Sequence, residues 1–271
     1  MFLMKYCRFL FNNAPRFGLV ETEGSTGREL ITRVFADDPH ARIPDLDAAS
    51  KRIEPMLLDD AKLLAPVIPS KIICVGRNYR AHVAELGNEV PAEPLLFFKP
   101  PSAINDPGGK IVCRRSIASR FDYEGELGVV IGKVCSRLTE NDDVRDYIFG
   151  YTGVNDFTAR DLQKKDGQWA RAKGFDTFCP VGPVVVDVLD PWAGVEVETR
   201  VNGEVKQHGN TSDFIFALDA VLRYASAVFT LFPGDLIATG TPEGVGPVNA
   251  GDVIEVSVAG VGTLRNTAVD E

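Results

Sequence analysis

Two glutamates, Glu124 and Glu126, stand two residues apart at the start of the apolar run Leu127-Gly128-Val129-Val130-Ile131. The run predicts a strand over residues 121–131, in which residues i and i+2 point to the same face. The two carboxylates would then lie roughly 7 Å apart, because each residue rises ~3.3 Å. Like charges this close in a partly buried strand repel unless a proton or a cation lies between them. The pair therefore indicates either a site for a hard divalent cation or an edge strand with a solvated acidic face.

A histidine and a glutamate form a second candidate pair. The segment from Gly76 to Gly87 predicts a helical turn that makes His82 and Glu85 neighbours at i and i+3. A carboxylate beside an imidazole raises its basicity and fixes its orientation, which suits a general base. A simple surface contact is the alternative.

The elements that position these residues lie in residues 70–271. Buried strands are predicted over 71–76 and 95–99, and the strand that ends near Asp156 would have to be a neighbour of the glutamate strand. The Asn202-Gly203 turn predicts a hairpin. The glycine-rich loop 240–247 lacks the lysine of a phosphate-binding P-loop and is not followed by a helix, so no nucleotide site is predicted.

Residues 1–69 are predicted to form a small, separate unit that ends in a proline-bounded linker. Three strand-like segments occur before residue 36, and residues 45–60 carry helical signals. His40 follows Asp37, Asp38 and Pro39, which predicts a solvated histidine in a polar loop. Nothing in this unit has the spacing of a catalytic site.

Composition limits the class of protein. The 45% hydrophobic and 25% charged fractions over 271 residues are those of an ordinary globular protein. The net charge of −9 argues against nucleic acid or an anionic membrane surface as a partner. No apolar run reaches the length of a transmembrane helix. Five scattered cysteines, an odd number without a C-x-x-C pair, predict reduced thiols in a cytoplasmic protein.

Six stretches of the sequence, in order, resemble one enzyme family. They are Gly76-Arg77-Asn78-Tyr79, Phe97-Phe98-Lys99-Pro100, Tyr123-Glu124-Gly125-Glu126-Leu127, residues 150–163, Lys173 and residues 233–247. Together they make residues 70–269 resemble the C-terminal catalytic domain of the fumarylacetoacetate hydrolase family. The resemblance implies an α+β, mostly β fold: a mixed β-sheet roll with few helices, after a small N-terminal α/β unit. The length is similar to that of the small acylpyruvase and 2-hydroxyhepta-2,4-diene-1,7-dioate isomerase-like members.

The resemblance also implies a role for each candidate residue. Glu124, Glu126 and Asp156 would hold Mg²⁺ or Mn²⁺, and three carboxylates without a nearby thiolate or histidine suit a hard, oxygen-binding ion better than zinc. His82 and Glu85 match a catalytic pair on a mobile lid, and Lys173 matches the active-site lysine that stabilises an enolate. The implied substrate-binding positions are Arg160, Gln163, Lys99, Tyr79 and Thr241, with Arg160 forking onto a substrate carboxylate.

The predicted function is a Mg²⁺-dependent hydrolase that cleaves a C–C bond in an acylpyruvate or related 2,4-dioxo acid through a metal-bound enolate. Oxaloacetate decarboxylation and 2-hydroxyhepta-2,4-diene-1,7-dioate isomerisation are alternatives on the same site. A non-catalytic metal- or anion-binding protein is a third, and the intact His82–Glu85 pair argues against it. The expected partners are a small 2-oxo acid and a second copy of the chain in a homodimer, the latter implied by the family.

Overall fold

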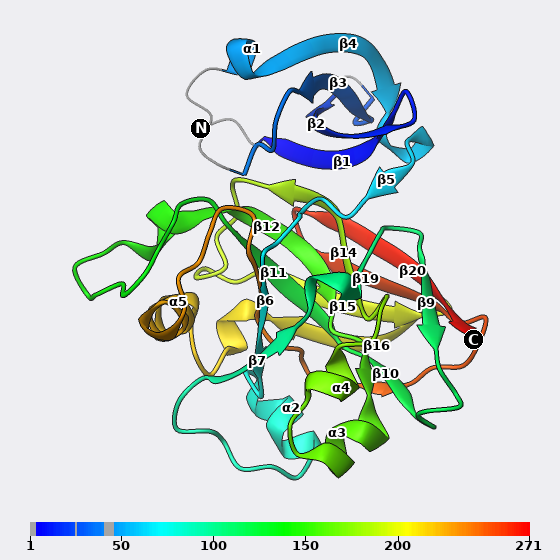
Figure 1. The fold of residues 1–271 in the computed structure, drawn as a ribbon, viewed down its shortest axis with the longest axis vertical. Coiled ribbons are helices and arrows are strands. Elements are labelled where there is room, and N and C mark those ends of the chain that lie inside the picture. The colour runs from blue at the N-terminus through cyan, green and yellow to red at the C-terminus, as the bar shows by residue number, and fades with distance from the viewer. Residues whose placement is uncertain (1–3, 25, 41–45) are drawn as a thin grey trace.

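The computed structural model describes residues 4–24, 26–40 and 46–271. One large sheet dominates these ranges (Figure 1). Its twelve strands are β1 (Lys5–Phe11), β2 (Ala14–Thr22), β3 (Glu29–Phe35), β4 (Ser50–Leu57), β5 (Leu63–Leu64), β6 (Ile72–Gly76), β7 (Leu95–Lys99), β8 (Ile104–Asn105), β11 (Gly125–Ile131), β12 (Ile148–Asn155), β14 (Cys179–Val186) and β17 (Leu236–Ala238). Their hydrogen-bonded order is β4-β3-β2-β1-β14-β12-β11-β17-β6-β7, with β5 on β1 and β8 on β14.

Two smaller sheets and a few helices complete the described fold. The five-stranded sheet contains β9 (Lys110–Cys113), β15 (Glu196–Val201), β16 (Glu204–Asn210), β19 (Val253–Val258) and β20 (Gly262–Asp270), in the order β16-β15-β19-β20-β9. The three-stranded sheet contains β10 (Phe121–Tyr123), β13 (Thr158–Ala159) and β18 (Gly246–Pro247). The α-helices are α1 (Leu46–Ala49), α2 (Arg80–Glu85), α3 (Arg160–Asp166), α4 (Ala170–Lys173) and α5 (Leu218–Val228). The predicted mostly β fold is confirmed, with both parallel and antiparallel pairs in the large sheet.

The N-terminal strands continue the large sheet. Strand β1 pairs antiparallel with β14, where Lys5 lies opposite Val186, and the ring of Tyr6 lies 4.9 Å from that of Phe149. In Figure 1 these strands form the upper lobe, and α2, α3 and α4 lie together at the opposite end. The candidate catalytic residues are therefore far from residues 1–69.

Two expectations for the N-terminal segment are wrong. Of residues 46–60, only Leu46–Ala49 form an α-helix, and β4 follows at once as the outer strand of the sheet. Pro55 lies within β4, where it would break a helix but is tolerated on a sheet edge. His40 is only 1% exposed, because its ring packs edge-on against Phe17 and Phe149.

Strand β11 is buried along its whole length. Leu127, Val129 and Ile131 pack into a core that includes Leu222 of α5, while Val130 packs into a second core on the other face of the sheet. A strand fixed on both faces and paired with β12 and β17 is a rigid support for the glutamates at its start.

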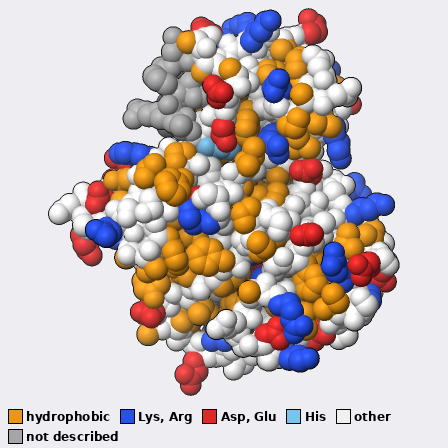
Figure 2. Space-filling model, in the orientation of Figure 1, with side chains coloured by type: hydrophobic (Ala, Val, Ile, Leu, Met, Phe, Trp, Pro, Cys, Tyr) orange, Lys and Arg blue, Asp and Glu red, His pale blue; other side chains and the backbone are white. Residues whose placement is uncertain are grey.

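The surface carries no single field of charge on the face drawn in Figure 2, where Lys and Arg side chains are intermixed with Asp and Glu. Among the helices of the described residues, none is long and apolar enough to cross a bilayer.

Candidate active site

The predicted strand over residues 121–131 is in fact two strands, divided at Glu124. Strand β10 belongs to the three-stranded sheet and β11 to the large sheet. Glu124 is held between them, because its N–H donates to Asn155 Oδ1 (3.0 Å) and its carbonyl accepts from the Asp156 N–H (2.8 Å). The continuous strand was therefore a wrong expectation, and the division places the Glu124 carboxylate where two sheets meet.

Three carboxylates converge at this junction. Glu124, Glu126 and Asp156 each offer an oxygen, and these oxygens lie within 4.8 Å of one another. All three side chains are buried. Asp156 directly follows β12, the antiparallel neighbour of β11, which explains how residues thirty positions apart meet. The structure thus brings together the three residues that the sequence grouped.

Two lysines neutralise part of this cluster. Lys173 Nζ donates to Glu124 Oε2 (2.8 Å) and to Asp156 Oδ2 (2.5 Å), and Lys99 Nζ donates to Asp156 Oδ1 (2.6 Å). Burial alone would raise the pKa of Glu124, but the charges of Lys173 and Arg160 outweigh it and hold that pKa below its usual value. Burial would likewise lower the pKa of Lys173, but Asp156 and Glu124 raise it, so this lysine stays protonated.

Glu126 is held differently from its two neighbours. Its Oε2 accepts the N–H of Gly240 (2.8 Å), and no Lys or Arg of the described residues lies within ion-pair distance of it. Burial, followed by the charges of Asp156 and Glu124, raises its pKa well above the usual value. A buried carboxylate with like-charged neighbours and no cation of its own fits a site completed by a positive ion.

Arg160 is engaged by the protein's own acids. Its Nε donates to Asp122 Oδ2 (2.8 Å), its Nη1 donates to Gln163 Oε1 (2.6 Å), and its Nη2 pairs with Glu124. Asp122 is fully buried and also binds Arg120 (Nε to Oδ1, 2.8 Å). The guanidinium donors of Arg160 that were expected to bind a substrate carboxylate thus bind Asp122 and Glu124 in this structure. Sequence reasoning gave Asp122 no role, although in the expected continuous strand it would have shared a face with the two glutamates.

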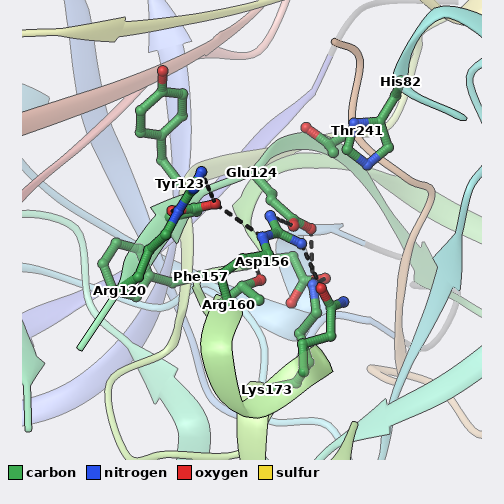
Figure 3. Close-up of polar contacts among 12 residues, drawn as sticks. His82, Arg120, Tyr123, Glu124, Asp156, Phe157, Arg160, Lys173 and Thr241 are labelled. Carbon is green, nitrogen blue, oxygen red and sulfur yellow. Dashed lines mark hydrogen bonds and ion pairs between the residues drawn. The ribbon is translucent and has the colours of Figure 1, made fainter. Parts of the chain in front are cut away.

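The His82–Glu85 pair forms as predicted on α2. His82 Nδ1 lies 3.2 Å from Glu85 Oε2, and Glu85 Oε1 accepts the N–H of Gly244 (3.0 Å). The glycine-rich loop therefore anchors the glutamate that orients the imidazole. In Figure 3, His82 lies apart from the cluster in which Glu124, Asp156, Arg160 and Lys173 converge.

A cavity of about 330 Å³ connects the pair to the cluster. Its lining includes nine of the predicted site residues, namely His82, Glu85, Glu124, Glu126, Asp156, Arg160, Gln163, Lys173 and Thr241. It also includes Arg77, Phe97, Lys164 and Trp169, to which the sequence assigned no function.

Lys99 and Tyr79 do not line this cavity, which corrects the pocket-lining positions expected for them. Lys99 is 1% exposed and lies behind Asp156. Tyr79 is 2% exposed, and its ring packs edge-on against Phe214. Both residue types can reach a pocket in principle, and only the packing of the neighbouring strands decides that these two do not.

Residues 71–269 match the family model described as the fumarylacetoacetate (FAA) hydrolase C-terminal region. The chain belongs to the fumarylacetoacetate hydrolase family. This confirms the resemblance seen in the sequence, and the mixed β fold is that of the family's C-terminal domain.

Three relatives show the range of named activities in the family. The oxaloacetate tautomerase YisK of Bacillus subtilis is 45% identical over 77% of this chain and 73% of its own length. The 2,4-didehydro-3-deoxy-L-rhamnonate hydrolase of a Sphingomonas strain is 36% identical over 97% and 95%. A crystal structure of a 2-hydroxyhepta-2,4-diene-1,7-dioate isomerase from Mycobacterium marinum is 42% identical, covers 99% of both chains and superposes with a TM-score of 0.85. Since these names describe three reaction types, membership alone does not fix the reaction.

Proposed function

We propose that the chain is a divalent-cation-dependent enzyme that hydrolyses a C–C bond in an acylpyruvate or related 2,4-dioxo acid. The observation that carries this proposal is that an oriented His82–Glu85 pair lines the same cavity as the carboxylate cluster and Lys173. A binding protein would have no need of a base placed in this way.

Glu124, Glu126 and Asp156 are the residues that would hold the ion, Mg²⁺ or Mn²⁺. Their buried oxygens suit a hard cation, and among the described residues Glu126 lacks the positive partner that its neighbours have. When bound, the ion would act as a Lewis acid toward the 2-oxo acid end of the substrate.

His82 is the proposed general base. With its Nδ1–H donated to Glu85, the imidazole keeps Nε2 free to take a proton from water. The resulting hydroxide attacks the carbonyl carbon remote from the 2-oxo acid, and the C–C bond on the pyruvate side breaks. The bonding pair goes to the pyruvate fragment, which leaves as an enolate and then takes up a proton, while the acyl fragment leaves as a carboxylic acid.

Lys173 is the proposed stabiliser of the enolate. Two of its ammonium protons are committed to Glu124 and Asp156, which leaves the third for the oxygen on which negative charge develops. Because the lysine is buried and already oriented, its charge needs no rearrangement when the reaction occurs.

A second candidate is isomerisation, tautomerisation or decarboxylation of a 2-oxo acid. The names of the Bacillus tautomerase and the Mycobacterium isomerase favour it. These reactions pass through the same enolate but need no attacking water. The two candidates therefore differ in one requirement: hydrolysis needs His82 to take a proton from water, and the other reactions do not.

The test compares several substrates in EDTA-treated protein with and without added Mg²⁺ or Mn²⁺. Acylpyruvate cleavage, oxaloacetate decarboxylation and dienedioate isomerisation are measured for the wild type, His82→Gln and the control His208→Gln, since His208 is exposed on β16. We expect cation-dependent cleavage that falls at least 100-fold in His82→Gln and persists in the control. Cleavage that survives in His82→Gln, or that ignores the cation, would overturn the hydrolase mechanism.

A further inference from the structure

Two positively charged side chains in the cavity have no acidic partner in the part of the chain that the structure describes. Of the cationic residues and histidine on its lining, Arg160 and Lys173 pair with Asp122, Glu124 and Asp156, and His82 pairs with Glu85. Arg77 and Lys164 make no ion pair or side-chain hydrogen bond with any described residue. Their charges are therefore available to a ligand.

Arg77 adopts a backbone conformation that its side chain disfavours. Its φ is +58°, in the left-handed region, where a residue other than glycine is destabilised by roughly 1–2 kcal/mol. The following residue fixes this conformation, because buried Asn78 accepts the N–H of Phe216 (2.8 Å) and donates to the carbonyl of Thr239 (2.8 Å). A strained residue held in place by its neighbours at the edge of a pocket points to a function for its side chain.

Arg77 and Lys164 come from two walls of the cavity. Arg77 follows β6, and Lys164 lies on α3. Beside Arg77, the β6 wall contacts Trp169, which follows α3 in the chain, since a Cβ built on Gly76 would lie 2.8 Å from the indole ring. Lys164 is exposed and Arg77 half-buried, so both lie nearer to solvent than the fully buried Lys173.

The deep end of the cavity does not need these two charges. In the carboxylate cluster and the residues behind it, four acids are matched in number by four basic residues, although Glu126 itself has no ion-pair partner among the described residues. The acids are Asp122, Glu124, Glu126 and Asp156, and the basic residues are Arg120, Arg160, Lys99 and Lys173. An added divalent ion would match the 2-oxo acid end of a substrate. Any further negative charge on the substrate would have to be met elsewhere in the cavity.

We propose that Arg77, assisted by Lys164, binds an anionic group at the end of the substrate remote from the 2-oxo acid. A guanidinium presents a fork of N–H donors that matches a carboxylate, whereas an unpaired arginine gains little from a neutral alkyl tail. This selectivity rests on the proposed function, and it makes the substrate a 2-oxo acid with a second acidic terminus.

The kinetic test uses two seven-carbon 2,4-dioxo acids, one ending in a methyl group and one in a carboxylate, with Mg²⁺ present. The measured quantity is the ratio of kcat/KM for the carboxylate-ended over the methyl-ended substrate. We expect Arg77→Gln to lower this ratio about tenfold to 100-fold, mainly through KM, because the contact is made in both the ground and the transition state. Lys164→Gln should lower it less, and Arg80→Gln, on the exposed side of α2, should leave it unchanged. An equal loss on both substrates in Arg77→Gln would overturn the assignment.

A binding test keeps this proposal separate from the reaction itself. Two six-carbon 2-oxo acids that lack the second keto group, one ending in a methyl group and one in a carboxylate, are titrated calorimetrically into the Mg²⁺-loaded protein. Preference for the carboxylate-ended acid in the wild type, lost in Arg77→Gln, supports the site even if no 2,4-dioxo acid is hydrolysed. Equal affinity of the wild type for both acids would overturn the site even if hydrolysis is observed.

Discussion

Replacing Glu126 with glutamine in EDTA-treated protein should increase its stability, although the same change at the neighbouring acids should decrease it. Glutamine has nearly the shape of glutamate and keeps an oxygen for the N–H of Gly240. It removes a buried charge that no Lys or Arg of the described residues neutralises. Glu124 and Asp156, by contrast, each have an ion pair with Lys173, and breaking a buried pair costs about 3–5 kcal/mol.

The size of the gain follows from the raised pKa of Glu126. A carboxyl whose pKa rises on folding contributes its full stability below the unfolded-state pKa, about 4.3, and loses it as the pH rises toward the folded-state pKa. One proton gives a slope of about 1.4 kcal/mol per pH unit, hence at most about 2.7 kcal/mol between pH 5 and pH 7. The advantage of Glu126→Gln over the wild type should therefore be small at pH 5 and reach about 1–3 kcal/mol at pH 7.

Urea unfolding at pH 5, 6 and 7 measures this directly for the wild type, Glu126→Gln, Glu124→Gln and Asp156→Asn. Added Mg²⁺ should make the wild type more stable than Glu126→Gln at pH 7. An ion at 100 times its Kd stabilises the wild type by about 2.7 kcal/mol, and it should stabilise Glu126→Gln by much less. If Glu126→Gln is destabilised at pH 7 as much as the other two, or if its advantage does not grow with pH, Glu126 is not the unbalanced charge of the cluster.

Two further predictions concern the residues around the cluster. Lys173→Met should lower kcat about 10²–10³-fold with little change in KM, because the charge of Lys173 acts mainly on the developing enolate. The control Lys165→Met, at an exposed position, should leave both constants unchanged. Both variants are measured by steady-state kinetics on the 2-oxo acid that the wild type converts, and a loss confined to KM would contradict the role of Lys173. Gly125→Ala should lower the free energy of unfolding by about 1–3 kcal/mol, because the new Cβ would lie 2.0 Å from Thr199 Oγ1. The control Gly24→Ala should leave the free energy of unfolding nearly unchanged, because nothing lies within 4 Å of its Cβ. Equal urea midpoints for the two variants would refute the prediction.

The sequence predicts those features of the structure that depend on residues close together in the chain. The Asn202-Gly203 turn forms the expected hairpin between β15 and β16, with φ of +52° and +82° at the two turn residues. The i, i+2 spacing of Glu124 and Glu126 places both carboxylates in one cluster even though the strand is divided at Glu124. The i, i+3 spacing of His82 and Glu85 gives the predicted contact.

Packing between distant segments is what the sequence could not predict. The burial of His40 depends on Phe17 and Phe149, which come from two different strands of the large sheet. The pairing of Arg160 with Asp122 joins a helix to a strand 38 residues earlier. Neither contact leaves a periodic pattern in the chain. Local sequence could therefore predict only a solvated loop histidine at His40, and the family resemblance only a substrate-binding arginine at Arg160.

The two halves of the site are held by structures of different rigidity. Glu124, Glu126 and Asp156 lie at the ends of strands that have paired neighbours on both sides. His82 and Glu85 lie on a six-residue helix, and the Glu85 side chain joins the rest of the protein through the N–H of Gly244. Segments with few buried contacts open at lower cost than central strands. In the proposed mechanism, stabilisation of the enolate depends on the carboxylate cluster and Lys173, whereas activation of the attacking water depends on His82. A change at His82 should therefore alter the kind of reaction before it abolishes the binding of a 2-oxo acid.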